Sequence, residues 1–144
     1  MKQTSLRARA RHRGFTLLEL LVVLVVLGLL AGIVAPKYFA QLGRSETKVA
    51  KAQIEGLGKA LDLYRLEVGH YPSTEQGLQA LVTAPPEESH WTGPYLQKKL
   101  PQDPWGRNYI YRYPGENSEY DLMSLGKDGQ PGGEGENAEV TNWQ

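Results

Sequence analysis

The stretch RGFTLLELLVVLVVLGLLAGIVA, residues 13–35, decides how this chain is built. The 21 residues from Phe15 to Ala35 include only two polar side chains, those of Thr16 and Glu19. At about 1.5 Å of rise per residue, a helix of this length spans the roughly 30 Å hydrocarbon core of a bilayer. The sequence therefore predicts a membrane-spanning helix. Because a carboxylate is costly in hydrocarbon, we expect Glu19 to have a compensating partner.

The residues Gly14 to Leu20 (GFTLLEL), behind a short basic leader, resemble the signal of type IV pilin-like proteins. The resemblance implies that a prepilin peptidase cuts between Gly14 and Phe15 and that Phe15 is then N-methylated. An ordinary secretory signal peptide is cut after its apolar region, which is lost. Here the cut falls before the apolar region, so the mature chain keeps its membrane helix. The alternative is an uncut signal anchor, which leaves Glu19 without a role.

Charge pairing gives Glu19 a physical role in assembly. A free α-amino group at Phe15 is cationic at neutral pH and lies about one helical turn from Glu19. The carboxylate can pair with its own amine or with the amine of a neighbouring subunit. In a packed bundle of such helices, pairing between neighbours sets the axial register. The resemblance implies the same use of this glutamate.

The distribution of charge along the chain also limits its membrane topology and the partners that it can bind. The leader, residues 1–14, carries five basic side chains and no acidic one, and its removal leaves 11 basic against 16 acidic side chains. A mature protein with this negative balance is not a nucleic-acid binder by bulk electrostatics. Positive residues stay cytoplasmic, so the carboxyl-terminal part is expected to face the periplasm of a two-membrane bacterium. With no cysteine, that part must be held together without disulfides.

The helical pattern continues past Pro36 as an amphipathic segment. Apolar residues recur at helical spacing at Ala50, Ile54, Leu57, Leu61, Tyr64 and Val68. This stripe predicts a helix that runs to about Val68 and packs one face on a core. A helix end near Gly69 is expected because Tyr71-Pro72 forbids continuation. A coiled-coil interface is the alternative use of the stripe.

Residues 70–144 are expected to cover that stripe. Ser73 to Gln76 is typical of a cap before a short helix. The alternation around Tyr109, Tyr111 and Tyr113 predicts a strand, and residues 119–125 are the returning strand of a β-hairpin. The fold class is therefore α+β, with a long amino-terminal helix, transmembrane in its first half and amphipathic in its second, packed on a small antiparallel β-sheet. A domain with a core of this size is only marginally stable unless a disulfide, a bound metal ion or a similar cross-link adds to it.

The tail, residues 126–144, is the candidate for such a cross-link. It is rich in glycine and in acidic side chains. Oxygen-rich, turn-forming segments suit calcium, which takes roughly six to eight oxygen ligands. On composition alone, a solvated disordered tail is the alternative.

Several blocks of the chain resemble the major pseudopilins of the type II secretion system. They are Thr74–Leu78 (TEQGL), Gly93–Leu96 (GPYL), Pro101–Tyr111 (PQDPWGRNYIY), Ser124–Gly129 (SLGKDG), Gly132–Gly135 (GGEG) and Asn142-Trp143. That family has a long amino-terminal helix, a small sheet and a calcium ion held by the last loop. The resemblance places the calcium ligands at the Leu125 carbonyl, the Asp128 carboxylate and positions near Asn137 and Glu139. Here Asn137 and Glu139 stand where aspartates are usual, which changes the downstream ligands.

The resemblance implies a filament subunit and no enzyme. Residues 1–14 form the leader, 15–35 the transmembrane and filament-core helix, and 36–144 a periplasmic domain. The subunit would polymerise with copies of itself into a periplasmic pseudopilus that drives export of folded proteins across the outer membrane. Its other partners would be minor pseudopilins, the prepilin peptidase, an inner-membrane platform and a cytoplasmic secretion ATPase.

Three alternatives share parts of this pattern. A type IV pilin for adhesion or DNA uptake shares the first part of the helix, but many such pilins close their last loop with a disulfide. A minor pseudopilin often lacks or changes the glutamate that is present here as Glu19. A membrane-tethered calcium-binding module acting alone would form no polymer.

Overall fold

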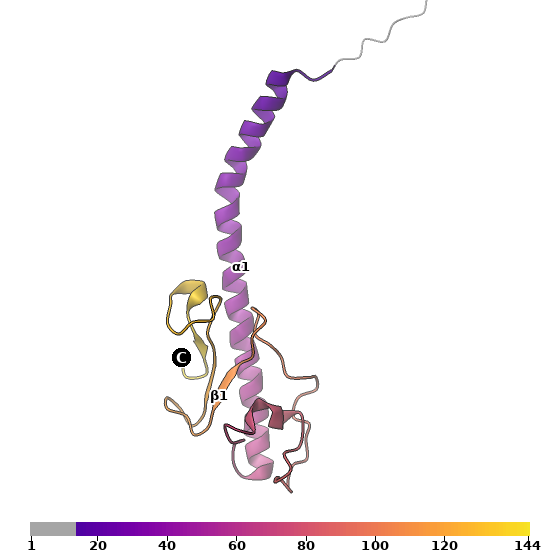
Figure 1. The fold of residues 1–144 in the computed structure, drawn as a ribbon, viewed down its shortest axis with the longest axis vertical. Coiled ribbons are helices and arrows are strands. Elements are labelled where there is room, and N and C mark those ends of the chain that lie inside the picture. The colour runs from indigo at the N-terminus through magenta and orange to yellow at the C-terminus, as the bar shows by residue number, and fades with distance from the viewer. Residues whose placement is uncertain (1–13) are drawn as a thin grey trace, which may run out of the picture. The chain divides into compact units, whose positions relative to one another are not determined.

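The computed structural model describes residues 14–144, so the predicted leader lies outside the described residues apart from Gly14. The described residues divide into two compact units, 14–39 and 40–144. The helix α1, Leu17–Val68, contributes to both units (Figure 1). It includes Pro36 within its span. The helix that the sequence predicted from Phe15 to about Val68 is thus confirmed to within two residues at its start.

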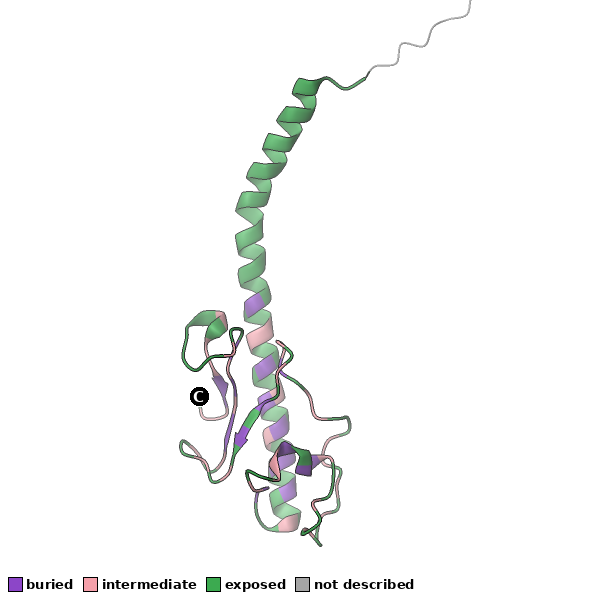
Figure 2. Cartoon of the chain, viewed as in Figure 1, coloured by how far each residue is buried: buried purple, intermediate pink, exposed green. Residues whose placement is uncertain are grey.

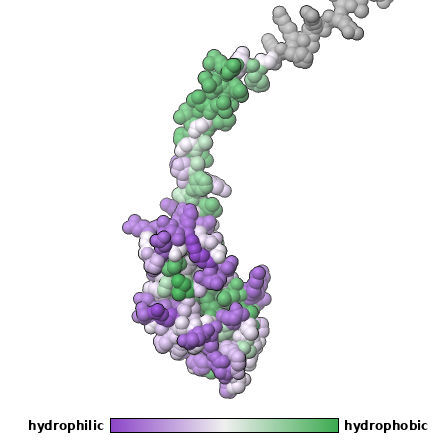
Figure 3. All heavy atoms as spheres, in the orientation of Figure 1, coloured by the Kyte–Doolittle hydropathy of each residue, from purple (hydrophilic) through white to green (hydrophobic). Residues whose placement is uncertain are grey.

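The first unit presents an uncovered apolar helix. The large hydrophobic side chains of residues 17–34 are between 48% and 86% exposed. Figure 3 shows hydrophobic residues over most of this part of α1. Within the described residues, α1 is the one helix long and apolar enough to cross a bilayer. Burying this surface needs a lipid bilayer or other apolar helices, since nothing in the unit itself covers it.

The second unit has its core along one face of α1. The buried residues of this face are Gly43, Ala50, Ile54, Leu57, Ala60, Leu61 and Tyr64. Figure 2 shows them as purple patches on the helix, on the side that the sheet and loops cover. The predicted stripe is confirmed, and it packs within the chain.

A short 3-10 helix, η1, Gly77–Leu81, caps one part of this core. Ser73 and Gln76 close the turn that precedes η1: the Ser73 N–H donates to Gln76 Oε1 at 2.8 Å, and the Gln76 N–H donates to Ser73 Oγ at 3.2 Å. The N-cap residue of η1 is Gln76, and it makes no side-chain cap bond to the helix. After η1, the Trp91 indole N–H donates to the Ala80 carbonyl at 2.7 Å. These bonds hold an irregular segment against the buried Leu78 and Leu81.

The sheet has three antiparallel strands in the order β1-β2-β3, which are Ile110–Arg112, Asp121–Ser124 and Val140–Thr141. Tyr111 lies opposite Leu122, and Ser124 lies opposite Val140. The predicted hairpin of β1 and β2 is confirmed. The third strand was not predicted, because two residues carry too little alternation to indicate a strand.

Aromatic side chains gather around the carboxyl end of α1. The rings of Tyr71 and Tyr120 meet edge to face with centroids 4.8 Å apart, and Tyr64 meets Tyr95 at 5.5 Å. The Tyr71 hydroxyl donates to Asp62 Oδ1 at 2.9 Å. Edge-to-face pairs add to the burial energy of aromatic residues. Tyrosines thus form part of the contact between the carboxyl end of α1 and the segments that pack on it.

Candidate functional site

The start of α1 is fixed by a reciprocal pair of hydrogen bonds. The Thr16 N–H donates to Glu19 Oε2 at 2.9 Å, and the Glu19 N–H donates to Thr16 Oγ1 at 3.2 Å. This is a capping box, which satisfies backbone donors that have no partner within the helix. The sequence analysis missed this role of Glu19, although Thr-x-x-Glu before an apolar run is its known signal.

The predicted cleavage site lies just before this cap. Gly14 and Phe15 precede α1, and the Phe15 side chain is 90% exposed. The backbone on which a peptidase would act is therefore outside the helix. Cleavage, methylation of Phe15 and the assembly role of Glu19 stay predictions.

The carboxyl-terminal loop, residues 125–139, doubles back on itself between β2 and β3. The Lys127 N–H donates to the Glu136 carbonyl at 2.9 Å, and the Asn137 N–H donates to the Glu134 carbonyl at 3.1 Å. A short 3-10 helix, η2, Gly135–Asn137, forms its outer turn. The Lys127 ammonium pairs with the Glu136 carboxylate at 2.6 Å. The two arms of the loop are thus joined by backbone and side-chain bonds.

Glycine is required where the arms approach each other. Gly126 has a φ of +76°, and a Cβ there would lie 2.6 Å from the Ala138 carbonyl oxygen. Gly133 has a φ of +107°, and its Cβ would lie 2.7 Å from the Asn137 carbonyl oxygen. Other residues rarely adopt such angles, and backbone atoms cannot move aside cheaply. The close approach of the two arms therefore depends on glycines of the SLGKDG and GGEG blocks.

The four predicted calcium ligands all lie in this loop. Leu125 and Glu139 are half-buried, whereas Asp128 and Asn137 are exposed. Asp128 Oδ1 accepts from the Gln130 N–H at 3.1 Å, and Glu139 Oε1 accepts from the Gly132 N–H at 3.1 Å. The Asn137 backbone carbonyl faces both Gly126 and Gly133. The structure brings these residues onto one loop without showing that their oxygens share a common centre.

The chemistry of the loop suits a hard cation. Within residues 14–144, none of the ion pairs involves Asp128 or Glu139, so these two carboxylates lack a cationic side-chain partner. No group of three or more His, Cys, Asp or Glu side chains gathers at metal-binding distance in the described part of the chain. Any calcium held here must take backbone carbonyls as well, which calcium does readily. The carboxylate and carbonyl oxygens of the loop are therefore donor types that fit calcium.

A turn at Asp103 supports the loop from outside. Asp103 is 5% exposed, and its Oδ1 accepts from the N–H groups of Trp105 and Arg107 at 3.1 and 2.8 Å. Its Oδ2 accepts from the Ser124 hydroxyl at 2.6 Å. The Trp105 indole N–H reaches Glu46 on α1 at 3.0 Å. The sequence indicated a turn here but not its connection to the end of β2 and to α1.

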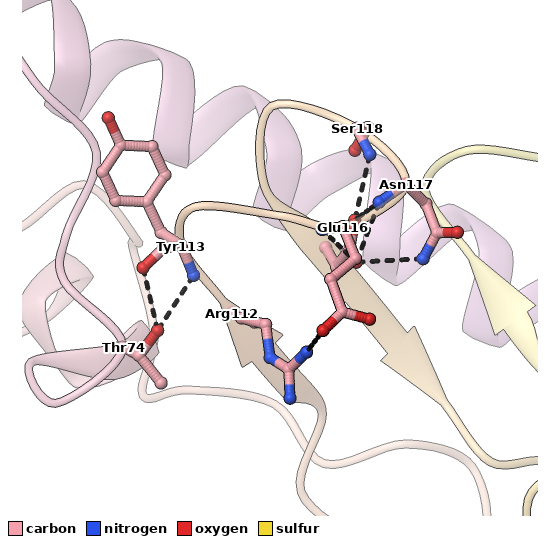
Figure 4. Close-up of polar contacts among 7 residues, drawn as sticks. Thr74, Arg112, Tyr113, Glu116, Asn117 and Ser118 are labelled. Atoms are coloured by element: carbon pink, nitrogen blue, oxygen red, sulfur yellow. Dashed lines mark hydrogen bonds and ion pairs between the residues drawn. The ribbon is translucent and has the colours of Figure 1, made fainter.

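A second buried carboxylate organises the hairpin turn. Asp121 is 3% exposed and accepts from the backbone N–H groups of Glu116, Asn117 and Ser118 at 2.9 to 3.2 Å (Figure 4). Burial opposes its ionisation, but these hydrogen bonds outweigh that effect and lower its pKa. Nearby in the same view, Thr74 bonds both the N–H and the carbonyl of Tyr113 at 3.0 Å.

Comparison with known proteins places the chain in a family. The family described as "Type II secretion system (T2SS), protein G" matches residues 37–143, and the "Prokaryotic N-terminal methylation motif" matches residues 9–35. The chain belongs to the type II secretion system protein G family. The resemblance given by its sequence blocks is thereby confirmed.

Relatives in this family align along nearly their whole length. The type II secretion system core protein G of Pseudomonas aeruginosa is 44% identical over 138 residues, covering 94% of this chain and 97% of the relative. The protein of the same name from Escherichia coli K12 is 43% identical over 141 residues, covering 96% and 95%. The major pseudopilin of enterohaemorrhagic Escherichia coli, known from a crystal structure, has 37% identity and a TM-score of 0.62. That match covers 73% of this chain and 92% of the other, and it confirms the α+β fold of the protein G family member described here.

Proposed function

We propose that this chain is the major structural subunit of a type II secretion pseudopilus. The observation that carries the proposal is the apolar helix of residues 17–34, whose large side chains are at least 48% exposed. Such a surface is stable in a bilayer before assembly and against copies of the same helix afterwards. Membership of the protein G family supports this use over that of a type IV pilin for adhesion or DNA uptake.

The subunit would begin as a single-pass protein of the inner membrane with residues 36–144 in the periplasm. The five basic leader residues hold the amino terminus in the cytoplasm. A prepilin peptidase would cut after Gly14 and methylate Phe15. The mature chain would keep its helix and assemble with copies of itself. Minor pseudopilins, an inner-membrane platform and a cytoplasmic secretion ATPase are its proposed partners, and the subunit itself is structural rather than enzymatic.

Glu19 is proposed to set the register of the filament. Its carboxylate already lies at the amino end of α1, on the N–H of Thr16, the residue after the proposed new terminus. The amine of Phe15 in a neighbouring subunit could share that carboxylate as the helices pack. Pairing removes the cost of an isolated charge in an apolar bundle, and its geometry selects one axial offset.

Glu19→Ala tests this role, with Leu18→Ala as a matched control that shortens a neighbouring exposed side chain. We expect Glu19→Ala to insert and be cut normally but to give few or no filaments in electron micrographs of overexpressing cells. Leu18→Ala should assemble. Normal filaments from Glu19→Ala would contradict the register role, and absence of filaments from the unmodified chain would contradict the filament proposal itself.

We further propose that the carboxyl-terminal loop binds calcium. The Leu125 carbonyl, Asp128, Asn137 and Glu139 would hold it. Bound calcium would add an oxygen-coordinated cross-link between the arms of the loop and compensate the two carboxylates. The proposal is supported by the oxygen-rich donor set and by the close crossing of the arms at Gly126 and Gly133.

A thermal melt of the full chain in detergent, with calcium and with chelator, tests the ion. At a calcium concentration about 100 times Kd, the folded state gains about 2.7 kcal/mol, which raises Tm by roughly 10 °C or more for a domain near 100 residues. Asp128→Ala should lose that rise, whereas Glu134→Ala, which removes a neighbouring acid outside the ligand set, should keep it. Equal Tm values with calcium and chelator in the unmodified chain would rule out the site.

A further inference from the structure

The strand β1 leaves one edge of the sheet free. In the order β1-β2-β3, β1 has a neighbouring strand on one side only. Tyr111 lies opposite Leu122, but the N–H and the carbonyl of Leu122 both bond to Asn142, on the other side of β2. In an antiparallel pair, successive residues turn their N–H and carbonyl groups to alternate sides. Tyr111 therefore turns both of its backbone groups away from β2, to the free edge.

A side chain already pairs one position of this edge. The Thr74 hydroxyl accepts from the Tyr113 N–H and donates to the Tyr113 carbonyl, both at 3.0 Å (Figure 4). A residue of an added strand would make the same two bonds. Tyr111 and Tyr109 repeat the orientation of Tyr113 at steps of two residues. Among the described residues, Tyr111 is bonded from outside the sheet only through its hydroxyl, which donates to the Pro72 carbonyl at 2.8 Å.

An open groove follows the unpaired part of the edge. It has a volume of about 890 Å³, and its walls are Tyr109 and Tyr111, part of η1 and residues 98–102. Leu78 and Leu100 give it an apolar portion. An extended chain advances about 3.3 Å per residue and points alternate side chains to opposite faces. The groove can therefore receive the backbone of a short extended segment together with its inward side chains.

The charge of this groove is positive. Lys98 and Lys99 line it and are both exposed, and none of its lining residues is an aspartate or a glutamate. Neither lysine takes part in an ion pair within the part of the chain that the structure describes. The chain after the leader has the opposite balance, with 11 basic against 16 acidic side chains. A positive groove on such a chain favours an acidic segment by charge complementarity.

We propose that the free edge of β1 binds an extended acidic segment of a partner protein, which adds to the sheet as a strand beside Tyr109 and Tyr111. Backbone hydrogen bonds to these two residues supply the affinity, and Lys98 and Lys99 supply the preference for carboxylates. An open sheet edge is a ready template for such pairing. The proposal goes beyond the filament role and lies within the second unit, so it can be tested on chains that have not assembled.

An NMR titration of the full chain in detergent tests the site with defined probes. The probe is an end-blocked peptide of sequence ETVTE, and the matched control is KTVTK. We expect ETVTE to shift the amide signals of Tyr109 and Tyr111 and to slow hydrogen exchange at Tyr111. KTVTK should bind at least about tenfold more weakly, because it brings like charges together. Equal binding of the two peptides would overturn the proposed preference for an acidic partner.

Reversal of the two lysines tests the same point on the chain. In the double variant Lys98→Glu, Lys99→Glu, we expect ETVTE to bind about tenfold more weakly or worse and KTVTK to bind more tightly. The double variant Lys48→Glu, Lys51→Glu is the matched control, since it makes the same change in net charge at exposed positions of α1 outside the groove. Protection of the Leu122 amide confirms that each variant is folded. Equal loss of ETVTE binding in both variants would contradict a role for the groove.

Backbone methylation of the probe tests the addition of a strand. Only alternate N–H groups of an added strand face β1. Methyl groups on the second and fourth nitrogens of ETVTE, or on the third alone, should therefore have opposite effects, with one pattern abolishing binding and the other keeping it. Equal effects of the two patterns would rule out strand addition. Slower exchange at Tyr111 with rising chain concentration alone would make a second copy of this chain the occupant, and the proposal of an acidic partner would fail.

Discussion

Asp121 shows how one buried carboxylate can fix a turn. It receives three backbone N–H groups and the Asn117 side-chain amide, and it has no cationic partner among the ion pairs of residues 14–144. Its lowered pKa follows from these hydrogen bonds acting against burial. Because the folded-state pKa lies below the unfolded value, the stabilisation is present above the unfolded pKa and is lost as pH falls through the folded pKa.

We predict that Asp121→Asn lowers the free energy of unfolding by about 1.5–3 kcal/mol at pH 7, the range for hydrogen bonds to a charged group. An amide would place a donor against N–H donors that need an acceptor. Chemical denaturation at pH 7 and at pH 3 measures the effect, which should shrink at the lower pH. Glu119→Gln, at an exposed ion pair with Arg65, serves as control. A difference that grows at pH 3 would contradict the sign.

Gly126 and Gly132 give a matched pair of glycines in the last loop. Both have positive φ, +76° and +84°, but only Gly126 has neighbours where a Cβ would be. We predict that Gly132→Ala costs about 1 kcal/mol from backbone strain alone and that Gly126→Ala costs at least about 2 kcal/mol. Thermal unfolding of both variants in chelator compares them. Equal Tm values would mean that the arms can separate at Gly126 without loss.

The helix α1 illustrates how one element can face two environments. Its first part is apolar all round, and its second part confines apolar residues to one face. The first pattern suits lipid or a helix bundle, and the second suits a core beneath a sheet. Local periodicity therefore determines both halves, and the capping box at Thr16 and Glu19 determines where the helix begins.

The strand β3 depends on a side chain more than on its own length. Asn142 Oδ1 accepts from the Leu122 N–H at 2.8 Å, Asn142 Nδ2 donates to the Tyr120 carbonyl at 2.9 Å, and the Asn142 N–H donates to the Leu122 carbonyl at 3.1 Å. The amide thus extends the pairing of β2 beyond the two residues of β3. Loss of the Asn142 side chain leaves the Leu122 N–H and the Tyr120 carbonyl without these partners.

We predict that Asn142→Ala destabilises the second unit by about 1–3 kcal/mol, the cost of unpaired buried polar groups. The Leu122 amide should exchange faster than in the unmodified chain, while amides of α1 near Leu57 change only in proportion to global stability. Gln144→Ala, at the exposed last residue, is the control. Unchanged exchange at Leu122 would show that β3 holds without the asparagine.

The second unit as a whole is a tyrosine-rich core. Burial is the largest cause that raises the pKa of Tyr64 and of Tyr120 to about 12, and it also raises the pKa values of Tyr109 and Tyr111. The Tyr64 hydroxyl is buried and has no hydrogen-bond partner among the described residues. In the unfolded chain these phenols ionise near pH 10. The unfolded state therefore gains free energy by releasing protons that the folded state retains.

We predict that these phenols leave stability unchanged from neutral pH up to about pH 9.5. Stability should then fall steeply between pH 10 and 12, the interval between the unfolded and folded pKa values. Tyr64→Phe should weaken that fall and leave stability at neutral pH equal or higher, because it removes a buried hydroxyl without a partner. Denaturant midpoints at pH 7 and pH 11 measure both effects. Identical losses for the variant and the unmodified chain at pH 11 would contradict this account.

Local patterns were enough to indicate the helix, its two kinds of surface, the β-hairpin and the pilin-like start. Helix and strand periodicities lie within one element, and the motif at Gly14 to Leu20 is contiguous, so both are visible in the sequence. The blocks SLGKDG and GGEG indicated an ordered last loop only through their resemblance to the major pseudopilins. The four proposed calcium ligands lie in that loop, although their assignment stays a prediction.

Contacts between residues far apart along the chain were decided only by the folded structure. Asp103 with Ser124, Trp105 with Glu46, Arg107 with Gly126 and Asn142 with Leu122 are separated by 19 to 59 positions. No local period or motif encodes such pairs, because each exists only after packing of the core brings two turns together. The chain's pattern thus determines which elements form, whereas burial of polar groups that must find partners determines how the last loop is held.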